Sequence, residues 1–134
     1  MPQRRDPQKV RVLIADDHTM VRQGLRSLLE NLSDLEVVGE AETGRQAVEQ
    51  ARQLHPDIVL MDVSMPEMDG IEATRQITQE HTCGDIVGLS MHHSDEMAER
   101  MHEAGARTYL TKDKAMDTLV AMVRAFGKPV DHTQ

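Results

Sequence analysis

The order of apolar and polar positions along the chain alternates between two periods. Short runs rich in Val, Ile and Leu are typical of buried strands, and between them apolar residues recur at the three- and four-residue spacing of an amphipathic helix. The predicted strands cover residues 10–15, 35–41, 57–62, 85–90 and 107–111. Repeated strand–helix units of this kind predict an α/β fold, with a parallel sheet that carries helices on both faces.

Several residues mark where the predicted helices begin and end. Thr43 and Ser94 are typical helix-starting residues, because their side-chain oxygens can accept a hydrogen bond from a free backbone N–H. Pro56 ends the second helix and Gly105 ends the fourth. Apolar positions within residues 116–126 predict a final amphipathic helix.

In an open parallel sheet, ligands bind beyond the carboxyl ends of the strands. The predicted strand ends carry three carboxylates, one hydroxyl and one ammonium, on Asp16, Asp17, Asp62, Ser90 and Lys112. Carboxylates packed this closely repel one another unless a cation compensates, and Mg²⁺ prefers oxygen ligands beside phosphate oxygens. An isolated Asp-Asp pair after a strand is more often a solvated turn, so the prediction of a cation site depends on the whole set.

Composition excludes several classes of function. The chain has 134 residues, which suits one domain, and its 15 basic and 23 acidic residues give a net charge of −8. That charge argues against direct nucleic-acid binding, and the scarcity of aromatic residues, only Tyr109 and Phe126, argues against stacking on bases. One cysteine, Cys83, excludes an internal disulfide and a multi-cysteine zinc site. With no apolar run long enough to span a membrane and no secretory signal, a soluble cytoplasmic domain is expected.

Four segments of the chain resemble, in order and spacing, the receiver domain of bacterial two-component response regulators. They are VRVLIADDH, DIVLMDVSMPEMDG, VGLS and GARTYLTKD. The resemblance implies a flavodoxin-like, doubly wound, five-stranded parallel sheet with strand order 2-1-3-4-5 and five helices. The receiver domain is expected over residues 9–126. The mostly polar, proline-containing ends predict an N-terminal tail over residues 1–8 and a linker or tail over 127–134.

The same resemblance implies a phosphoryl-accepting site. Asp62 matches the phosphoacceptor, Asp17 a direct Mg²⁺ ligand, and Asp16 a carboxylate that acts through metal-bound water. The backbone carbonyl of Ser64 would be a further ligand, and Mn²⁺ could replace Mg²⁺. Such a domain is a signalling module and not an enzyme with a separate substrate; it catalyses only its own phosphorylation and dephosphorylation.

Three further residues match the catalytic and switch positions of the family. Ser90 matches the hydroxyl that bonds the phosphoryl group, Tyr109 the aromatic switch, and Lys112 the cation that pairs with Asp62 or its phosphate. The implied partner is a sensor histidine kinase. The surface that changes would be formed by the fourth helix, fifth strand and fifth helix, with a homodimer as one outcome.

The chain departs from the family pattern at a few positions. Asp113 follows Lys112 where many receivers have proline, which leaves the geometry of that loop open. Thr19 stands where the subfamily often has proline, and Met91 is larger than the residue common after the switch hydroxyl. The methionines at helical spacing are expected to fill the core. Met97 and Met101 are possible exceptions, because they lie on the proposed output helix.

The sequence is compatible with two kinds of output for this domain. The segments ADDHTMVRQGLRSLLE and VVGEAETGRQAVE are most similar to the NarL/FixJ (LuxR-type) subfamily, whose members usually carry a C-terminal DNA-binding helix-turn-helix. Only eight residues follow Phe126, so we expect either the receiver part of a transcription factor or a stand-alone receiver that acts by protein contacts.

Two other classes of protein share parts of this pattern. An aspartyl-phosphate phosphatase generally needs a second acid two residues after its nucleophile, where this chain has Ser64. A flavodoxin needs a hydroxyl-rich phosphate loop after the first strand, where this chain has the acidic segment ADDHTM. Both classes are therefore less well supported than the receiver.

Overall fold

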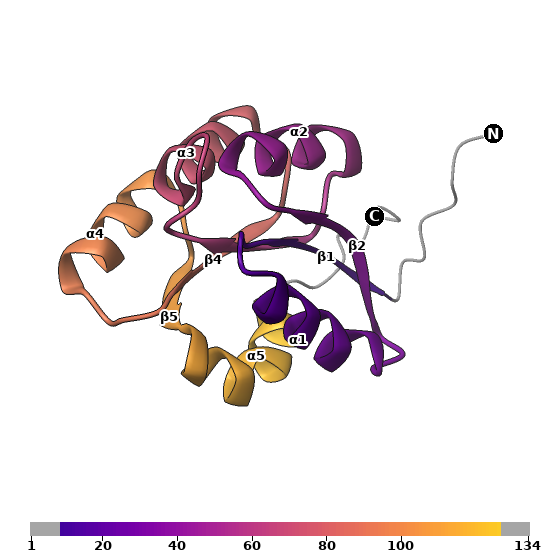
Figure 1. The fold of residues 1–134 in the computed structure, drawn as a ribbon. Coiled ribbons are helices and arrows are strands. Elements are labelled where there is room, and N and C mark those ends of the chain that lie inside the picture. Colours follow the sequence, from indigo (N-terminus) through magenta and orange to yellow (C-terminus); the bar gives the residue numbers. More distant parts are fainter. Residues whose placement is uncertain (1–8, 127–134) are drawn as a thin grey trace.

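The computed structural model describes residues 9–126, which form a five-stranded parallel sheet with helices on both faces (Figure 1). The strand order is β2-β1-β3-β4-β5, which confirms the predicted flavodoxin-like architecture. The strands are β1 (Val10–Ala15), β2 (Leu35–Ala41), β3 (Ile58–Asp62), β4 (Asp85–Ser90) and β5 (Thr108–Thr111). The helices are α1 (Thr19–Glu30), α2 (Gly44–Leu54), α3 (Gly70–Glu80), α4 (Asp95–Ala104) and α5 (Lys112–Phe126).

The sheet separates two apolar cores. Helices α2, α3 and α4 cover one face, and α1 and α5 cover the other (Figure 1). Side chains alternate along each strand, so Leu13 of β1 packs toward α2 and α3 while Val12 and Ile14 pack toward α1 and α5. Strand β3 lies at the centre of the sheet, and all five of its residues are buried, as the apolar run predicts.

The predicted helix-starting residues have the expected contacts. The hydroxyl of Thr43 accepts a hydrogen bond from the Gln46 backbone N–H at 3.0 Å, and Ser94 accepts one from Met97 at 3.3 Å. Thr19 is the first residue of α1, where a backbone N–H has no partner within the helix. Threonine can therefore replace proline there without losing a helical hydrogen bond.

The last helix begins earlier than the apolar pattern indicates. Helix α5 starts at Lys112, directly after β5, so the loop expected between them is absent. Asp113 lies in the first turn of this helix, where a carboxylate interacts favourably with the free backbone N–H groups. The consequence for function is that Lys112 is fixed by a strand on one side and a helix on the other.

The expectation that methionines fill the core is only partly confirmed. Met61 and Met101 are fully buried, but Met20, Met91 and Met116 are 80%, 59% and 42% exposed. Met20 and Met116 border an apolar hollow between α1 and α5. Among residues 9–126, no helix combines the length and the apolar character that crossing a bilayer requires. The two predicted tails lie outside the described residues.

Candidate functional site

The carboxyl ends of β1 and β3 bring two acidic residues side by side. The two strands are neighbours, and Ala15 pairs with Met61. Asp16 and Asp62, the next residue in each chain segment, therefore lie side by side at the edge of the sheet. Asp16 is fully buried and Asp62 is 2% exposed. The two predicted carboxylates therefore lie together in a place from which water is largely excluded.

Lys112 brings a positive charge to this pair. Its Nζ lies 2.8 Å from Asp16 Oδ2 and 3.5 Å from Asp62 Oδ2, and the residue is 8% exposed. A buried carboxylate next to a second one is costly unless a cation is near, because the charges repel and neither is well solvated. The ammonium supplies one positive charge for two negative ones, which leaves the group short of a cation.

The electrostatic balance is visible in the acidity of Asp62. Burial raises the pKa of Asp62 to about 7, the negative charge of Asp16 adds to the rise, and Lys112 opposes it. Neither Asp16 Oδ2 nor Asp62 Oδ2 accepts a hydrogen bond of good geometry from the described residues. Two buried oxygens without a well-aligned hydrogen bond are suited to a cation with a preference for oxygen ligands, so the residues fit the divalent ion that the sequence predicts.

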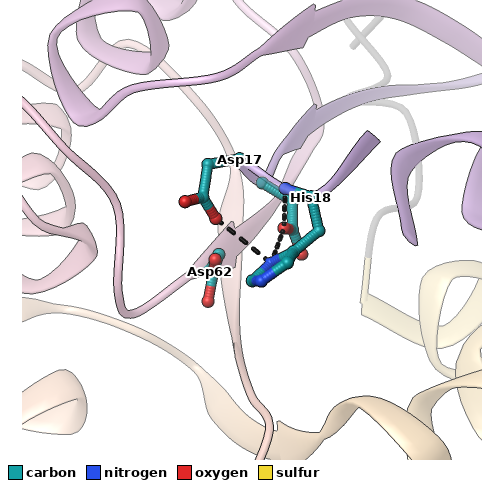
Figure 2. Close-up of side chains that lie close together, drawn as sticks. Asp17, His18 and Asp62 are labelled. Atoms are coloured by element: carbon teal, nitrogen blue, oxygen red, sulfur yellow. Dashed lines mark hydrogen bonds and ion pairs between the residues drawn. The ribbon is translucent and has the colours of Figure 1, made fainter. Parts of the chain in front are cut away.

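The loop after β1 adds two more side chains (Figure 2). Asp17 is exposed, and its Oδ1 lies 3.1 Å from Nδ1 of His18. The same nitrogen lies 3.0 Å from Asp16 Oδ1. One ligand atom from each of Asp16, Asp17, His18 and Asp62 lies within 4.8 Å of the others, so these four residues could hold a metal ion. We call them the acidic cluster.

Ser64 contacts the phosphoacceptor candidate through its backbone. Its N–H donates a hydrogen bond to Asp62 Oδ1 at 3.3 Å, while its side chain is exposed. The turn between β3 and α3 thus helps to hold the Asp62 carboxylate in place. An open hollow beside it is lined by Asp17, Ser64 and, from α4, Met97 and Arg100. The hollow is open to solvent beside Asp17 of the acidic cluster.

The two predicted switch residues share one acceptor. Ser90 Oγ donates to the backbone carbonyl of His92 at 2.8 Å, and the Tyr109 hydroxyl donates to the same carbonyl at 3.4 Å. The ring of Tyr109 is half-buried and packs beside Gly88, where an added Cβ would lie 3.5 Å from it. Ser90 therefore lies at the predicted strand end, but its hydroxyl is held by the loop that follows and not by the acidic cluster.

Two residues near the site were not predicted from sequence. One is His18, which immediately follows the acidic pair in the segment ADDH. The other is Arg22, a nearly buried residue of α1 whose Nη1 donates to the Asp16 carbonyl at 2.7 Å. Arg22 also forms ion pairs with Glu40 and Glu42, both at 3.1 Å. Arg22 could have been found from sequence as a charged residue between the apolar positions Val21 and Leu25 of the predicted helix.

Comparison with known proteins agrees with this geometry. Residues 12–124 match the family model for the response regulator receiver domain. The chain is 39% identical over 115 residues to the response regulator GacA of Pseudomonas viridiflava, covering 86% of this chain and 54% of that protein. It is 44% identical over 119 residues to the transcriptional regulatory protein LiaR of Bacillus subtilis, covering 89% and 56%. The chain thus spans about half the length of these curated relatives.

A solved structure extends the likeness to three dimensions. The signal receiver domain of the putative response regulator NarL from Mycobacterium tuberculosis superposes with a TM-score of 0.85 at 30% identity, covering 92% of this chain and 100% of that one. A LuxR-family two-component response regulator from Aurantimonas sp. SI85-9A1 gives a TM-score of 0.81 at 36% identity, covering 89% and 85%. The chain belongs to the family of response regulator receiver domains, and its relatives are regulators of the NarL and LuxR type.

Proposed function

We propose that this domain accepts a phosphoryl group on Asp62 and transmits the change to an output. The observation that carries the proposal is the environment of the Asp62 carboxylate. It is buried at the end of the central strand, its Oδ2 accepts no hydrogen bond from the described residues, and a lysine ammonium lies 3.5 Å away. A nucleophile next to a fixed positive charge is what transfer of an anionic phosphoryl group requires.

The proposed donor is a phosphohistidine on a sensor histidine kinase. A carboxylate oxygen of Asp62 attacks phosphorus in line, so that an O–P bond forms as the P–N bond breaks. The electron pair of that bond stays on the imidazole of the donor, which takes up a proton. Lys112 lies within 3.5 Å of Asp62 Oδ2 and is placed to neutralise charge on the phosphoryl oxygens. Hydrolysis of the resulting acyl phosphate returns the domain to its starting state.

The acidic cluster supports a divalent cation as the second source of positive charge. We propose that Asp17, Asp62 and the Ser64 carbonyl hold Mg²⁺ or Mn²⁺ directly and that Asp16 acts through a bound water. When bound, the ion would supply charge neutralisation for the phosphoryl oxygens. The buried Oδ2 atoms of Asp16 and Asp62, which accept no well-aligned hydrogen bond from the described residues, favour this assignment.

We propose that the shared carbonyl of His92 couples the site to the surface. A phosphoryl group adds strong acceptor oxygens, and Ser90 would give up its bond to His92 to donate to one of them. Tyr109, which bonds the same carbonyl, would then rearrange with the loop. The surface affected is formed by α4, β5 and α5.

The energy available sets a limit on this switch. A charge-assisted hydrogen bond contributes about 1.5–3 kcal/mol. Reversing a 1:99 population requires about 5.5 kcal/mol of differential binding. One new bond falls short of that, and two reach it only at the upper end of the range, so we propose that dimerisation or binding of a partner completes the transition.

We propose transcription as the output, through a DNA-binding domain outside this chain. This proposal is supported by the relatives described as transcriptional regulators and by the fact that the chain spans about half of their length. Because the relay begins at a kinase that uses cellular ATP, we place the domain in the cytoplasm.

Phosphoacceptance is tested by intact-mass spectrometry after incubation with acetyl phosphate and Mg²⁺. We expect one added phosphoryl group on the wild-type chain and none on Asp62→Asn. Asp117→Asn, on an exposed residue of α5, is the matched control and should be labelled like the wild type. Equal labelling of Asp62→Asn would contradict the proposal. Repeated turnover of a phosphate ester would indicate a phosphatase instead.

A further inference from the structure

One member of the acidic cluster is not a carboxylate. Nδ1 of His18 lies 3.0 Å from Asp16 Oδ1, 3.1 Å from Asp17 Oδ1 and 3.2 Å from Lys112 Nζ. Figure 2 shows the contact of His18 with Asp17. A ring nitrogen carries either a hydrogen or a lone pair. With a hydrogen it suits the two carboxylates but opposes the ammonium, and with a lone pair it suits the ammonium but opposes the carboxylates. Each state of the nitrogen therefore has a partner but also leaves it next to a group that it repels.

The distances in the cluster match those around a small cation. Neighbouring ligands of an octahedral ion lie about 3.0 Å apart when the metal–ligand bonds are about 2.1 Å long. The distance from His18 Nδ1 to Oδ1 of Asp17, the carboxylate proposed as a direct ligand, is 3.1 Å. Asp62 supplies a buried oxygen, Oδ2, that accepts no hydrogen bond within the described part of the chain. A cation among these atoms would satisfy the nitrogen lone pair and the carboxylates together.

The backbone holds His18 at this position. The residue precedes the first turn of α1, where its carbonyl accepts a hydrogen bond from the Arg22 N–H at 3.0 Å. Its own N–H donates to Asp16 Oδ1 at 2.8 Å. The side chain remains 53% exposed, so an aqueous ion can reach the ring.

We propose that Nδ1 of His18 is a direct ligand of the divalent cation and makes this site prefer a transition-metal ion, Mn²⁺, over Mg²⁺ more strongly than the carboxylates alone would. Imidazole nitrogen is a good ligand for transition metals, whereas Mg²⁺ requires oxygen and releases water reluctantly. This inference rests on the cation site of the proposed function. It adds to that site a nitrogen donor and a selectivity that the oxygen ligands do not provide.

Pulsed electron paramagnetic resonance of the Mn²⁺-loaded chain tests the ligand directly. A coordinated imidazole couples its ¹⁴N nucleus to the electron spin of Mn²⁺. We expect this coupling in the wild type and in His102→Gln, a control at an exposed histidine of α4 outside the acidic cluster. We expect it to be lost in His18→Gln, with Mn²⁺ still bound by the carboxylates. Bound Mn²⁺ without nitrogen coupling in the wild type would overturn the inference.

Titration calorimetry with Mg²⁺ and Mn²⁺ tests the selectivity. In His18→Gln we expect the affinity for Mn²⁺ to fall by about tenfold or more, since removal of even a supporting contact typically costs that much. The affinity for Mg²⁺ should change less, so that the preference for Mn²⁺ falls. An unchanged preference would overturn the inference.

The two proposals fail in different ways. If neither ion binds the wild type, the cation site itself is wrong and the inference falls with it. If Mg²⁺ supports phosphorylation of Asp62 while Mn²⁺ shows no nitrogen coupling, the proposed function stands and only the role of His18 is wrong.

Discussion

At the scale of the residue, the chemistry of the site depends on the surroundings of Asp62. Its carboxylate is buried, faces Asp16 and has the Lys112 ammonium 3.5 Å away. Burial and the charge of Asp16 raise the pKa of Asp62 to about 7. In the unfolded chain the same group ionises near pH ~4. Folding therefore favours the protonated acid as long as no further cation is present.

This difference predicts a pH-dependent stability of the metal-free protein. The folded state binds one more proton than the unfolded state between the two pKa values, so the free energy of unfolding falls as the pH rises from about 4 to about 7. Asp62→Asn carries no such charge. We expect the variant to be more stable than the wild type above pH 7, by up to about 4 kcal/mol, and to lose this advantage toward pH 4.

Urea unfolding in the presence of EDTA, at about pH 5 and about pH 8, measures the two free energies. The wild type and Asp62→Asn should differ more at about pH 8 than at about pH 5. The same difference at both pH values would show that ionisation of Asp62 does not destabilise the folded state. Asp117→Asn, on the exposed face of α5, should show no such dependence.

Sequence predicts some site residues better than others. Asp16, Asp17, Asp62 and Lys112 each come directly after an apolar run or at its end, so the topology of the sheet is enough to bring them together. The contact of His18 with the carboxylates was not predicted, because it depends on how the chain turns into α1. The bond from Ser90 to the loop carbonyl was not predicted either, since that loop has no periodic pattern.

At the scale of the element, α3 is packed against the backbone that carries Asp62. The Gly70 N–H donates to the Val63 carbonyl at 2.8 Å, and a Cβ added at Gly70 would lie 2.0 Å from the Asp62 carbonyl oxygen. Only glycine allows this approach of helix and strand end. The position of the phosphoacceptor candidate thus depends on a residue that has no chemical role.

Gly70→Ala is therefore expected to lower the free energy of unfolding by about 1–3 kcal/mol, the usual cost of overpacking, and to slow phosphorylation because Asp62 must shift. Gly24→Ala is the matched control. Gly24 lies inside α1, where an added Cβ has only an ordinary contact at 3.6 Å with Met116, so alanine should stabilise the protein by about 0.5–1 kcal/mol. Urea unfolding and the rate of acetyl phosphate labelling measure both effects. Equal effects of the two substitutions would contradict the packing argument.

The elements themselves differ in how far their boundaries can be predicted. Thr43 and Ser94 indicate the starts of α2 and α4, because their side chains have a defined role there. The start of α5 at Lys112 could not be predicted, since lysine and aspartate are equally compatible with a loop. The order of the strands was not contained in the apolar pattern, which indicates parallel pairing but not which strands are neighbours.

At the scale of the whole molecule, the site and the proposed output surface meet at the end of β4. Ser90 lies at that end, and Tyr109 of β5 shares its acceptor. In the proposed switch, a change at Asp62 reaches α4 and β5 through this one carbonyl group. The sole tyrosine of the chain lies on this route, and no tryptophan is present, so its fluorescence can report the change without background from those residues.

Ser90→Ala tests this route separately from phosphorylation. The variant should still be labelled at Asp62, although more slowly, because the nucleophile and Lys112 are intact. In the wild type, we expect labelling to shift the protein toward dimer or to change its tyrosine fluorescence, and we expect Ser90→Ala to lose this response. Analytical ultracentrifugation before and after labelling measures the shift toward dimer. Association that responds to phosphorylation as strongly as in the wild type would contradict the coupling through His92.

We propose that Asp62 carries the phosphoryl group. Locating the modified residue is the most direct test of this role. Borohydride reduces an aspartyl phosphate to homoserine, which marks the modified position for peptide mass spectrometry. After labelling with acetyl phosphate and Mg²⁺, we expect homoserine to replace aspartate at position 62 and at no other acid of the chain. Homoserine at a different position, or none at all in a chain that has gained a phosphoryl group, would contradict it.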